Sequence, residues 1–132
     1  MEKSDWLTRI AKSFNSRIES VGFEPLEGMP ACVYRDPEQI EAYYIMIDKD
    51  QVICPFQILH ALYHEIAHVI RFDLGYMRHK RYEEAREGAA DWFAFEALGM
   101  IDERGQIKPK HRACYDCMKM HYSKTCLKER AL

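Results

Sequence analysis

Residues His64-Glu65-Ile66-Ala67-His68 form an HExxH motif, with two histidines four positions apart and a glutamate after the first. Residues four apart lie on the same face of a helix, so the two imidazoles can bind one zinc ion. Glu65 then lies beside the metal and can take a proton from a water whose pKa zinc has lowered, and pass it to a leaving amine. The motif therefore predicts a zinc-dependent peptidase. The alternative is a chance match on a solvated surface, but the motif falls where its chemistry requires, on an amphipathic helix.

A catalytic zinc site needs a third protein ligand and one open position. Glu87 is the best candidate, because it follows His68 by 19 residues, enough for a loop and a returning helix. Asp91, one turn later, is expected to accept a hydrogen bond from the far nitrogen of a ligating histidine and so fix its tautomer. Glu83 and Glu84 compete for the ligand role, although acids at the start of a helix are also favoured by its dipole.

Further polar residues lie near the motif in the sequence. Three residues between the two site helices are candidates for stabilising the oxyanion of a transition state: Tyr76, His79 and Tyr82. The alternative for each of them is an ordinary surface residue. His60 lies one turn before His64, where it either borders the site or is a partly buried helix histidine.

The elements that must position these residues can be predicted from periodicity. Apolar residues at helical spacing predict a first helix from about Ser4 to Gly22, including Ile18 and Val21 on its buried face. β-favouring residues predict strands between 31 and 54, most clearly at 43–47. Two helices follow, at about 56–72 with the HExxH motif and about 82–98 with Glu87. The order of elements indicates an α+β, mostly helical fold with a small β-sheet flanking the HExxH helix.

The HExxH helix followed by a helix with ExxxD is similar to the gluzincin metallopeptidases, and residues 1–100 more closely resemble the ImmA/IrrE family of small intracellular zinc peptidases. The stretch 87–94, EGAADWFA, keeps most of that family's ExxANxFA pattern, with Asp91 where the family usually has asparagine. The resemblance implies a minimal zincin-like domain and regulatory proteolysis of a protein partner, often a transcriptional repressor encoded by a phage or mobile element. It also implies that the strand at about 43–47 binds extended substrate by edge pairing.

The C-terminal segment carries a second candidate metal site. Its four potential ligands are spaced like a shortened zinc knuckle and would suit a closed, structural zinc site: Cys114, Cys117, His121 and Cys126. The alternative is a basic helix whose thiols pack against the domain. We therefore divide the chain into a metallopeptidase domain, 1–101, and a Cys-rich segment, 102–132, which is a candidate zinc-binding subdomain.

Charge and composition limit the classes of molecule that this protein is expected to bind. Residues 1–101 carry 11 Lys/Arg against 17 Asp/Glu, while residues 102–132 carry 8 against 4. The acidic body argues against nucleic acid as a partner, except through the basic tail. The chain has neither a long apolar run nor a signal-like N-terminus, so we expect a cytoplasmic protein with no membrane partner. The main alternative function is a non-catalytic zinc-containing module that binds protein or nucleic acid, although such a module would have no need of Glu65.

Overall fold

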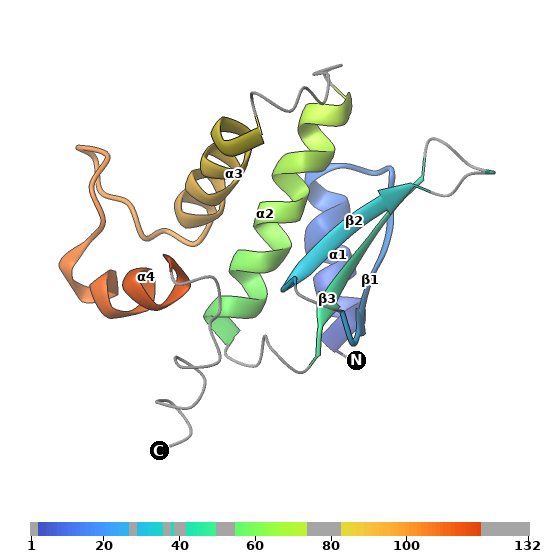
Figure 1. The fold of residues 1–132 in the computed structure, drawn as a ribbon, viewed down its shortest axis with the longest axis horizontal. Helices are drawn as coiled ribbons and strands as arrows, with labels where there is room; N and C mark the ends of the chain where they lie inside the picture. The colour runs from blue at the N-terminus through green and yellow to red at the C-terminus, as the bar shows by residue number, and fades with distance from the viewer. Residues whose placement is uncertain are drawn as a thin grey trace.

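A computed structural model describes residues 3–26, 29–35, 38, 42–49, 55–73 and 83–119. Its helices are α1 (Lys3–Phe14), α2 (Pro55–Asp73), α3 (Glu83–Ala97) and α4 (Arg112–Lys119), with a short 3₁₀ turn, η2 (Pro109–His111), before α4. Its strands are β1 (Ile18–Glu24), β2 (Ala31–Arg35) and β3 (Tyr43–Asp48) (Figure 1). The fold is therefore α+β, as predicted. None of the described helices has both the length and the apolar composition needed to cross a membrane.

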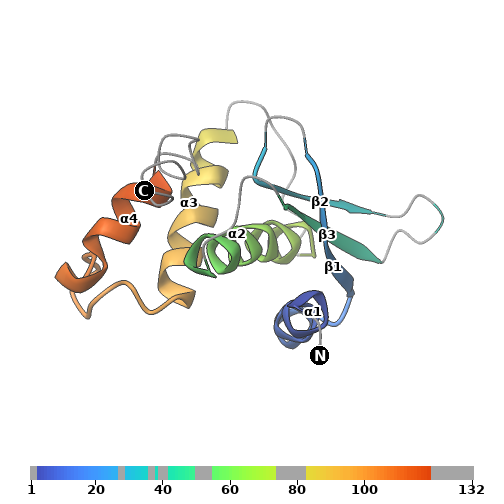
Figure 2. The ribbon, with the colours of Figure 1, turned by 90° about the horizontal axis from the view of Figure 1, so that it is seen from below.

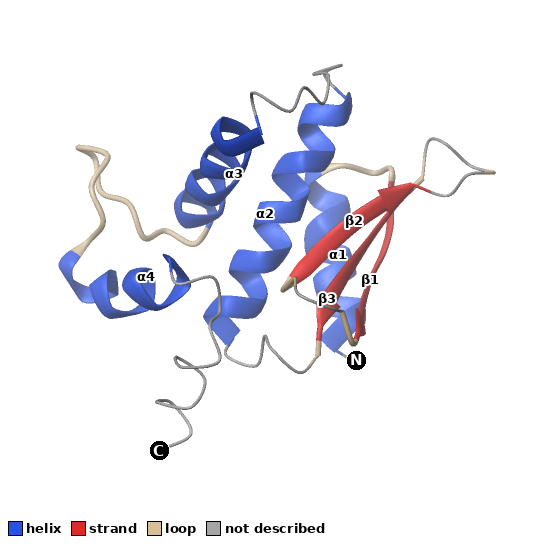
Figure 3. Cartoon of the chain, in the orientation of Figure 1, coloured by secondary structure: helices blue, strands red, loops and turns tan. Residues whose placement is uncertain are grey.

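The three strands form one mixed sheet in the order β1-β3-β2 (Figure 3). β3 runs parallel to β1 and antiparallel to β2, so it has a hydrogen-bonded neighbour on each side. The prediction that the strand at 43–47 binds substrate by edge pairing is therefore wrong, because its backbone groups are already paired within the sheet. Among the described strands, β2 and β1 form the two edges.

The first helix ends at Phe14, eight residues earlier than the periodicity predicted. Asn15 ends it, because its side-chain oxygen accepts a hydrogen bond from the Arg17 N–H at 2.9 Å and turns the chain into β1. Ile18 and Val21 are buried as predicted, but on a strand. A register shift between Ile18 and Ser20 lets two residues spaced by three face the same core, which explains why helix and strand gave the same apolar pattern.

Helices α1 and α2 cover one face of the sheet, and α3 packs beside α2 (Figure 2). The core between α2 and the sheet is apolar and fully buried, and includes Leu62, Ile66, Val69, Ile45 and Ile47. Burying each such side chain contributes about 1.5–3 kcal/mol to the free energy of folding, and this stabilises the packing of α2 on the sheet. The HExxH motif therefore lies on a helix whose opposite face is fixed in the core.

Helix α3 begins and ends within one residue of its predicted bounds. Gly99, at φ 71°, takes the left-handed conformation that ends the helix. Its N–H donates to the Glu96 carbonyl, and the Met100 N–H donates to the Phe95 carbonyl at 3.1 Å. This pair of bonds closes the C-terminus of α3 and lets fully buried Met100 join the core.

The chain then returns to the body of the protein through η2 and α4. Asp102 organises the connecting loop by accepting hydrogen bonds from the N–H groups of Arg104 and Gln106. On α4, Cys114 and Tyr115 are half-buried and pack against the core. The described part of the C-terminal segment is thus in contact with the helical layer.

Candidate metal centre

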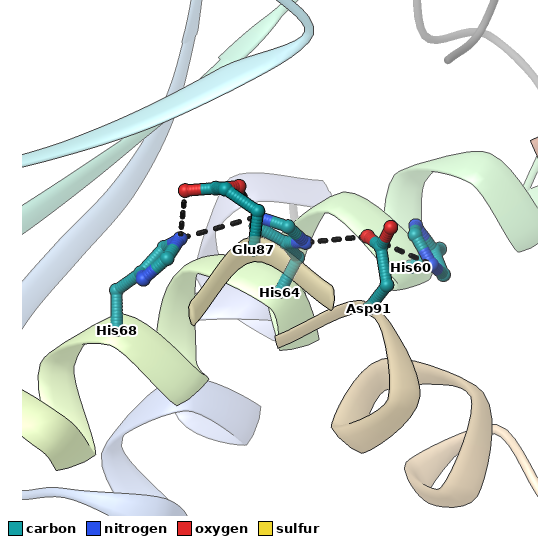
Figure 4. Close-up of polar contacts among 5 residues, drawn as sticks. All are labelled: His60, His64, His68, Glu87 and Asp91. Carbon is teal, nitrogen blue, oxygen red and sulfur yellow. Dashed lines mark hydrogen bonds and ion pairs between the residues drawn. The ribbon is translucent and has the colours of Figure 1, made fainter. Parts of the chain in front are cut away.

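Two crossing helices build the site. α2 supplies His64 and His68 from successive turns, and α3 supplies Glu87 and Asp91 from successive turns of its own (Figure 4). Each pair shares a helix face because its members are four residues apart. Packing of α3 on α2, aided by buried Ala90 and Ala94, brings the two polar faces together. The site therefore joins residues up to 27 positions apart.

Three potential ligands converge on one point. His64 Nε2 lies 2.8 Å from Glu87 Oε2, His68 Nε2 lies 3.1 Å from Glu87 Oε1, and the two Nε2 atoms are 3.2 Å apart. Both histidine side chains are 16% exposed, whereas Glu87 is 53% exposed and forms the open side of the site. The structure thus joins the two predicted histidine ligands to the predicted glutamate.

These separations suit a tetrahedral metal. Zn–N and Zn–O bonds of about 2.0–2.2 Å at tetrahedral angles place ligand atoms roughly 3.3–3.6 Å apart, which is farther than the 2.8, 3.1 and 3.2 Å seen between these side chains. Two imidazoles and one carboxylate are also the ligands of a common class of catalytic zinc sites, which keep a fourth position for water or substrate. The donor set and its geometry therefore fit zinc, with small outward shifts of the side chains.

Asp91 orients the first histidine. Its Oδ1 atom lies 2.7 Å from His64 Nδ1, and its side chain is 22% exposed. A carboxylate accepts, so Nδ1 carries the hydrogen, and a neutral His64 then has its lone pair on Nε2. Asp91 thus favours the tautomer whose Nε2 lone pair faces His68 and Glu87, and the predicted contact between Asp91 and a histidine of the motif is present.

The charges of the site reinforce one another. Burial alone would lower the pKa of His64, but its hydrogen bonds with Asp91 and then Glu87 outweigh this effect and raise the pKa to about 10. The hydrogen bonds from His64 and His68 hold the pKa of Glu87 well below its usual range. Without a metal, a positively charged His64 therefore lies between two carboxylates, and a divalent cation can replace that charge.

Glu65 lies beside the convergence point. It is only 7% exposed, and its carboxylate and the ring nitrogens of His64 and His68 lie within 4.8 Å of one another. As the residue after His64, it leaves α2 at a different angle from the two histidines. The carboxylate of Glu65 therefore belongs to the same cluster as the two imidazoles, while Glu87 is the carboxylate in contact with both of them.

The other predicted site residues are described only in part. The candidate oxyanion stabilisers Tyr76, His79 and Tyr82 lie outside the described residues. Glu83 and Glu84 lie in the first turn of α3, with their side chains outside the described set.

The C-terminal thiols are also described in part. Cys114 is a free thiol packed against the core, whereas the side chain of Cys117 and all of His121 and Cys126 lie outside the described residues. The second zinc site therefore stays a prediction.

His60 is the residue whose relation to the site the sequence left open. It is 2% exposed, and its Nε2 atom lies 3.8 Å from Asp91 Oδ1. Its position four residues before His64 placed it on the correct face of α2, but only the packing of α3 brings Asp91 beside it.

No protein-family model, curated protein or solved structure matches this chain.

Proposed function

We propose that this protein is a zinc-dependent endopeptidase. The observation that carries the proposal is the convergence of His64 Nε2, His68 Nε2 and the Glu87 carboxylate, with the buried carboxylate of Glu65 beside them. A site that only held a structural metal would have no need of a second, non-ligating carboxylate. The resemblance of residues 1–100 to the ImmA/IrrE family supports the same conclusion and makes a repressor or another regulatory protein in the cytoplasm the proposed substrate.

Each residue of the site would have a separate role in peptide hydrolysis. His64, His68 and Glu87 would hold the zinc, which when bound polarises a carbonyl and lowers the pKa of water. Glu65 would accept a proton from the attacking water and deliver it to the leaving amine. Asp91 would keep the His64 ring in place while charge develops.

An edge strand beside the site supports a peptide as the substrate. β2 is an edge strand of the described sheet and contacts α2, the helix that carries both histidines. An extended peptide that paired with the backbone of β2 would lie alongside α2 and close to Glu65. We therefore assign the substrate-pairing role to β2 in place of the strand at 43–47.

The proposal is tested by Glu65→Gln. This substitution removes the base but keeps the size of the side chain and the three ligands, so the variant should bind zinc within about twofold of wild type. Its peptidase activity should fall by about 10²–10⁴-fold, the usual contribution of a general base. Activity can be measured on a proteome-derived peptide library by mass spectrometry of new termini, without knowledge of the natural substrate.

The matched control is Glu96→Gln, which makes the same change at an exposed position of α3 and should cleave like wild type. Unchanged cleavage by Glu65→Gln would refute the assigned mechanism. A wild-type protein that binds zinc but cleaves neither the library nor a co-expressed candidate repressor would favour the non-catalytic binding module.

A further inference from the structure

His60 and the ligand His64 lie on consecutive turns of α2 and face the same oxygen atom. Asp91 Oδ1 is 2.7 Å from His64 Nδ1 and 3.8 Å from His60 Nε2 (Figure 4). The oxygen therefore lies between two imidazoles, of which only one belongs to the metal-binding motif. Because Asp91 is 22% exposed and His60 is almost completely buried, His60 covers the protein side of this carboxylate.

The position of the His60 ring is fixed by packing. Its centroid lies 4.5 Å from that of Phe95, a fully buried residue one turn beyond Asp91 on α3. Phe95 in turn contacts Tyr115 of α4, with ring centroids 4.8 Å apart. A row of rings thus runs from α4 to the carboxylate that orients His64, and it leaves the His60 ring little freedom to turn away.

We propose that His60 is a positioning residue for the metal centre, whose Nε2–H holds the Asp91 carboxylate on Nδ1 of His64. The inference rests on the proposed zinc site. A carboxylate at the edge of solvent can rotate toward water, and a proton-bearing nitrogen on its buried side favours the rotamer that faces α2. By keeping Asp91 in that rotamer, His60 fixes the tautomer and the ring orientation with which His64 presents Nε2 to the metal.

The size of the effect follows from the distance. At 3.8 Å the Nε2–Oδ1 separation is longer than a hydrogen bond, so His60 attracts the carboxylate without a short bond. Loss of a direct partner of a metal-binding histidine lowers metal affinity by about 10–100-fold. His60 acts one residue farther away, so its loss should lower zinc affinity by about 5–10-fold, at or below the lower end of that range.

The test compares His60→Met with His60→Gln. The two replacements have nearly the same length and shape, but only glutamine offers an N–H close to the position of Nε2. Zinc affinity is measured by competition with a chromogenic chelator, and thermal unfolding of the zinc-free proteins shows whether both variants are equally stable. We expect His60→Met to bind zinc about 5–10-fold more weakly than wild type and His60→Gln to stay within about twofold. Equal affinities of the two variants would overturn the proposal.

A second comparison separates positioning from general destabilisation. If His60 acts through Asp91, then His60→Met should change zinc affinity by less than about twofold in an Asp91→Ala background. The same loss in both backgrounds would overturn the proposal. Failure of the wild-type protein to bind zinc would overturn both this inference and the proposed function, whereas zinc binding with no effect of His60→Met would overturn this inference alone.

A measurement on the wild-type protein does not depend on any variant. Long-range ¹H–¹⁵N correlation spectra distinguish a protonated from an unprotonated imidazole nitrogen. The proposal expects a hydrogen on Nε2 of His60 in the zinc-loaded protein. An unprotonated Nε2 would contradict it, because two acceptors would then face each other.

Discussion

Replacement of Glu87 by alanine tests whether the convergence of α2 and α3 builds a metal site. Glu87 contacts both histidines, through Oε2 to His64 at 2.8 Å and through Oε1 to His68 at 3.1 Å. Because the side chain is 53% exposed and lies on a helix, its truncation should leave the fold intact. The variant should therefore lose zinc affinity, while the zinc-free protein stays folded and loses only the half-exposed ion pair with His64, about 1 kcal/mol or less.

The magnitude follows from the number of ligands. Structural zinc sites with four ligands bind with about 10–16 kcal/mol at pH 7, or roughly 3 kcal/mol for each ligand. This corresponds to roughly a hundredfold in affinity. Part of the loss is offset, because without Glu87 the pKa of His64 is no longer raised by that carboxylate, so zinc competes with a less tightly held proton. We therefore expect a decrease of about 30–300-fold.

The assay is zinc titration against a chelator at fixed pH, with Glu96→Ala as the control on the exposed surface of the same helix. The control should bind zinc like wild type. Equal affinities of Glu87→Ala and Glu96→Ala would refute the assignment of Glu87 as the third ligand. A loss seen only in Glu83→Ala or Glu84→Ala would move the ligand one helical turn toward the N-terminus of α3.

Two further predictions concern protons and packing. Without metal the pKa of His64 is raised from 6.5 to about 10, so zinc binding at pH 7 should release about one proton from His64, and zinc affinity should rise with pH up to about 10. Calorimetry in buffers of different ionisation enthalpy measures the number of protons released. A release of no protons would contradict the ion-pair arrangement. The stability of the zinc-free fold should depend on pH in the opposite direction. The raised pKa of His64 stabilises that fold fully below pH 6.5, and this contribution is lost as the pH rises toward 10. Leu62→Ala, at a fully buried position of α2, should lower the free energy of unfolding by about 2–5 kcal/mol in urea titrations, and a change below about 1 kcal/mol would mean that the α2–sheet core is misassigned.

Local sequence signals are enough to specify the features that lie within one helix. The four-residue spacing of His64 and His68 places two imidazoles on one face of any helix, and the apolar stripe with Leu62 and Ile66 turns the opposite face into the core. The observed bounds of α2 and α3 also agree with local signals, because Pro55 suits the first turn of α2 and Gly99 ends α3. These are features of short range, for which neighbouring residues carry the information.

The sequence was ambiguous where the same apolar spacing fits both a helix and a strand. Ile18 and Val21 are three residues apart, which fits a helix face and also a strand with a register shift. The decision came from pairing with β3, whose residues lie more than 20 positions away. The central place of β3 was hidden for the same reason, since strand order depends on which segments pair and not on the composition of either one.

How the two site helices meet depends on tertiary packing. Glu87 and Asp91 share a face of α3, but their contacts with His64 depend on the angle and the closeness at which α3 packs on α2. The same packing places His60 between Phe95 and Asp91, so that a residue readable as an ordinary core histidine lies next to the carboxylate of the site. Side-chain contacts between helices arise from the summed packing of many apolar residues, and that sum is not encoded at any one position of the sequence.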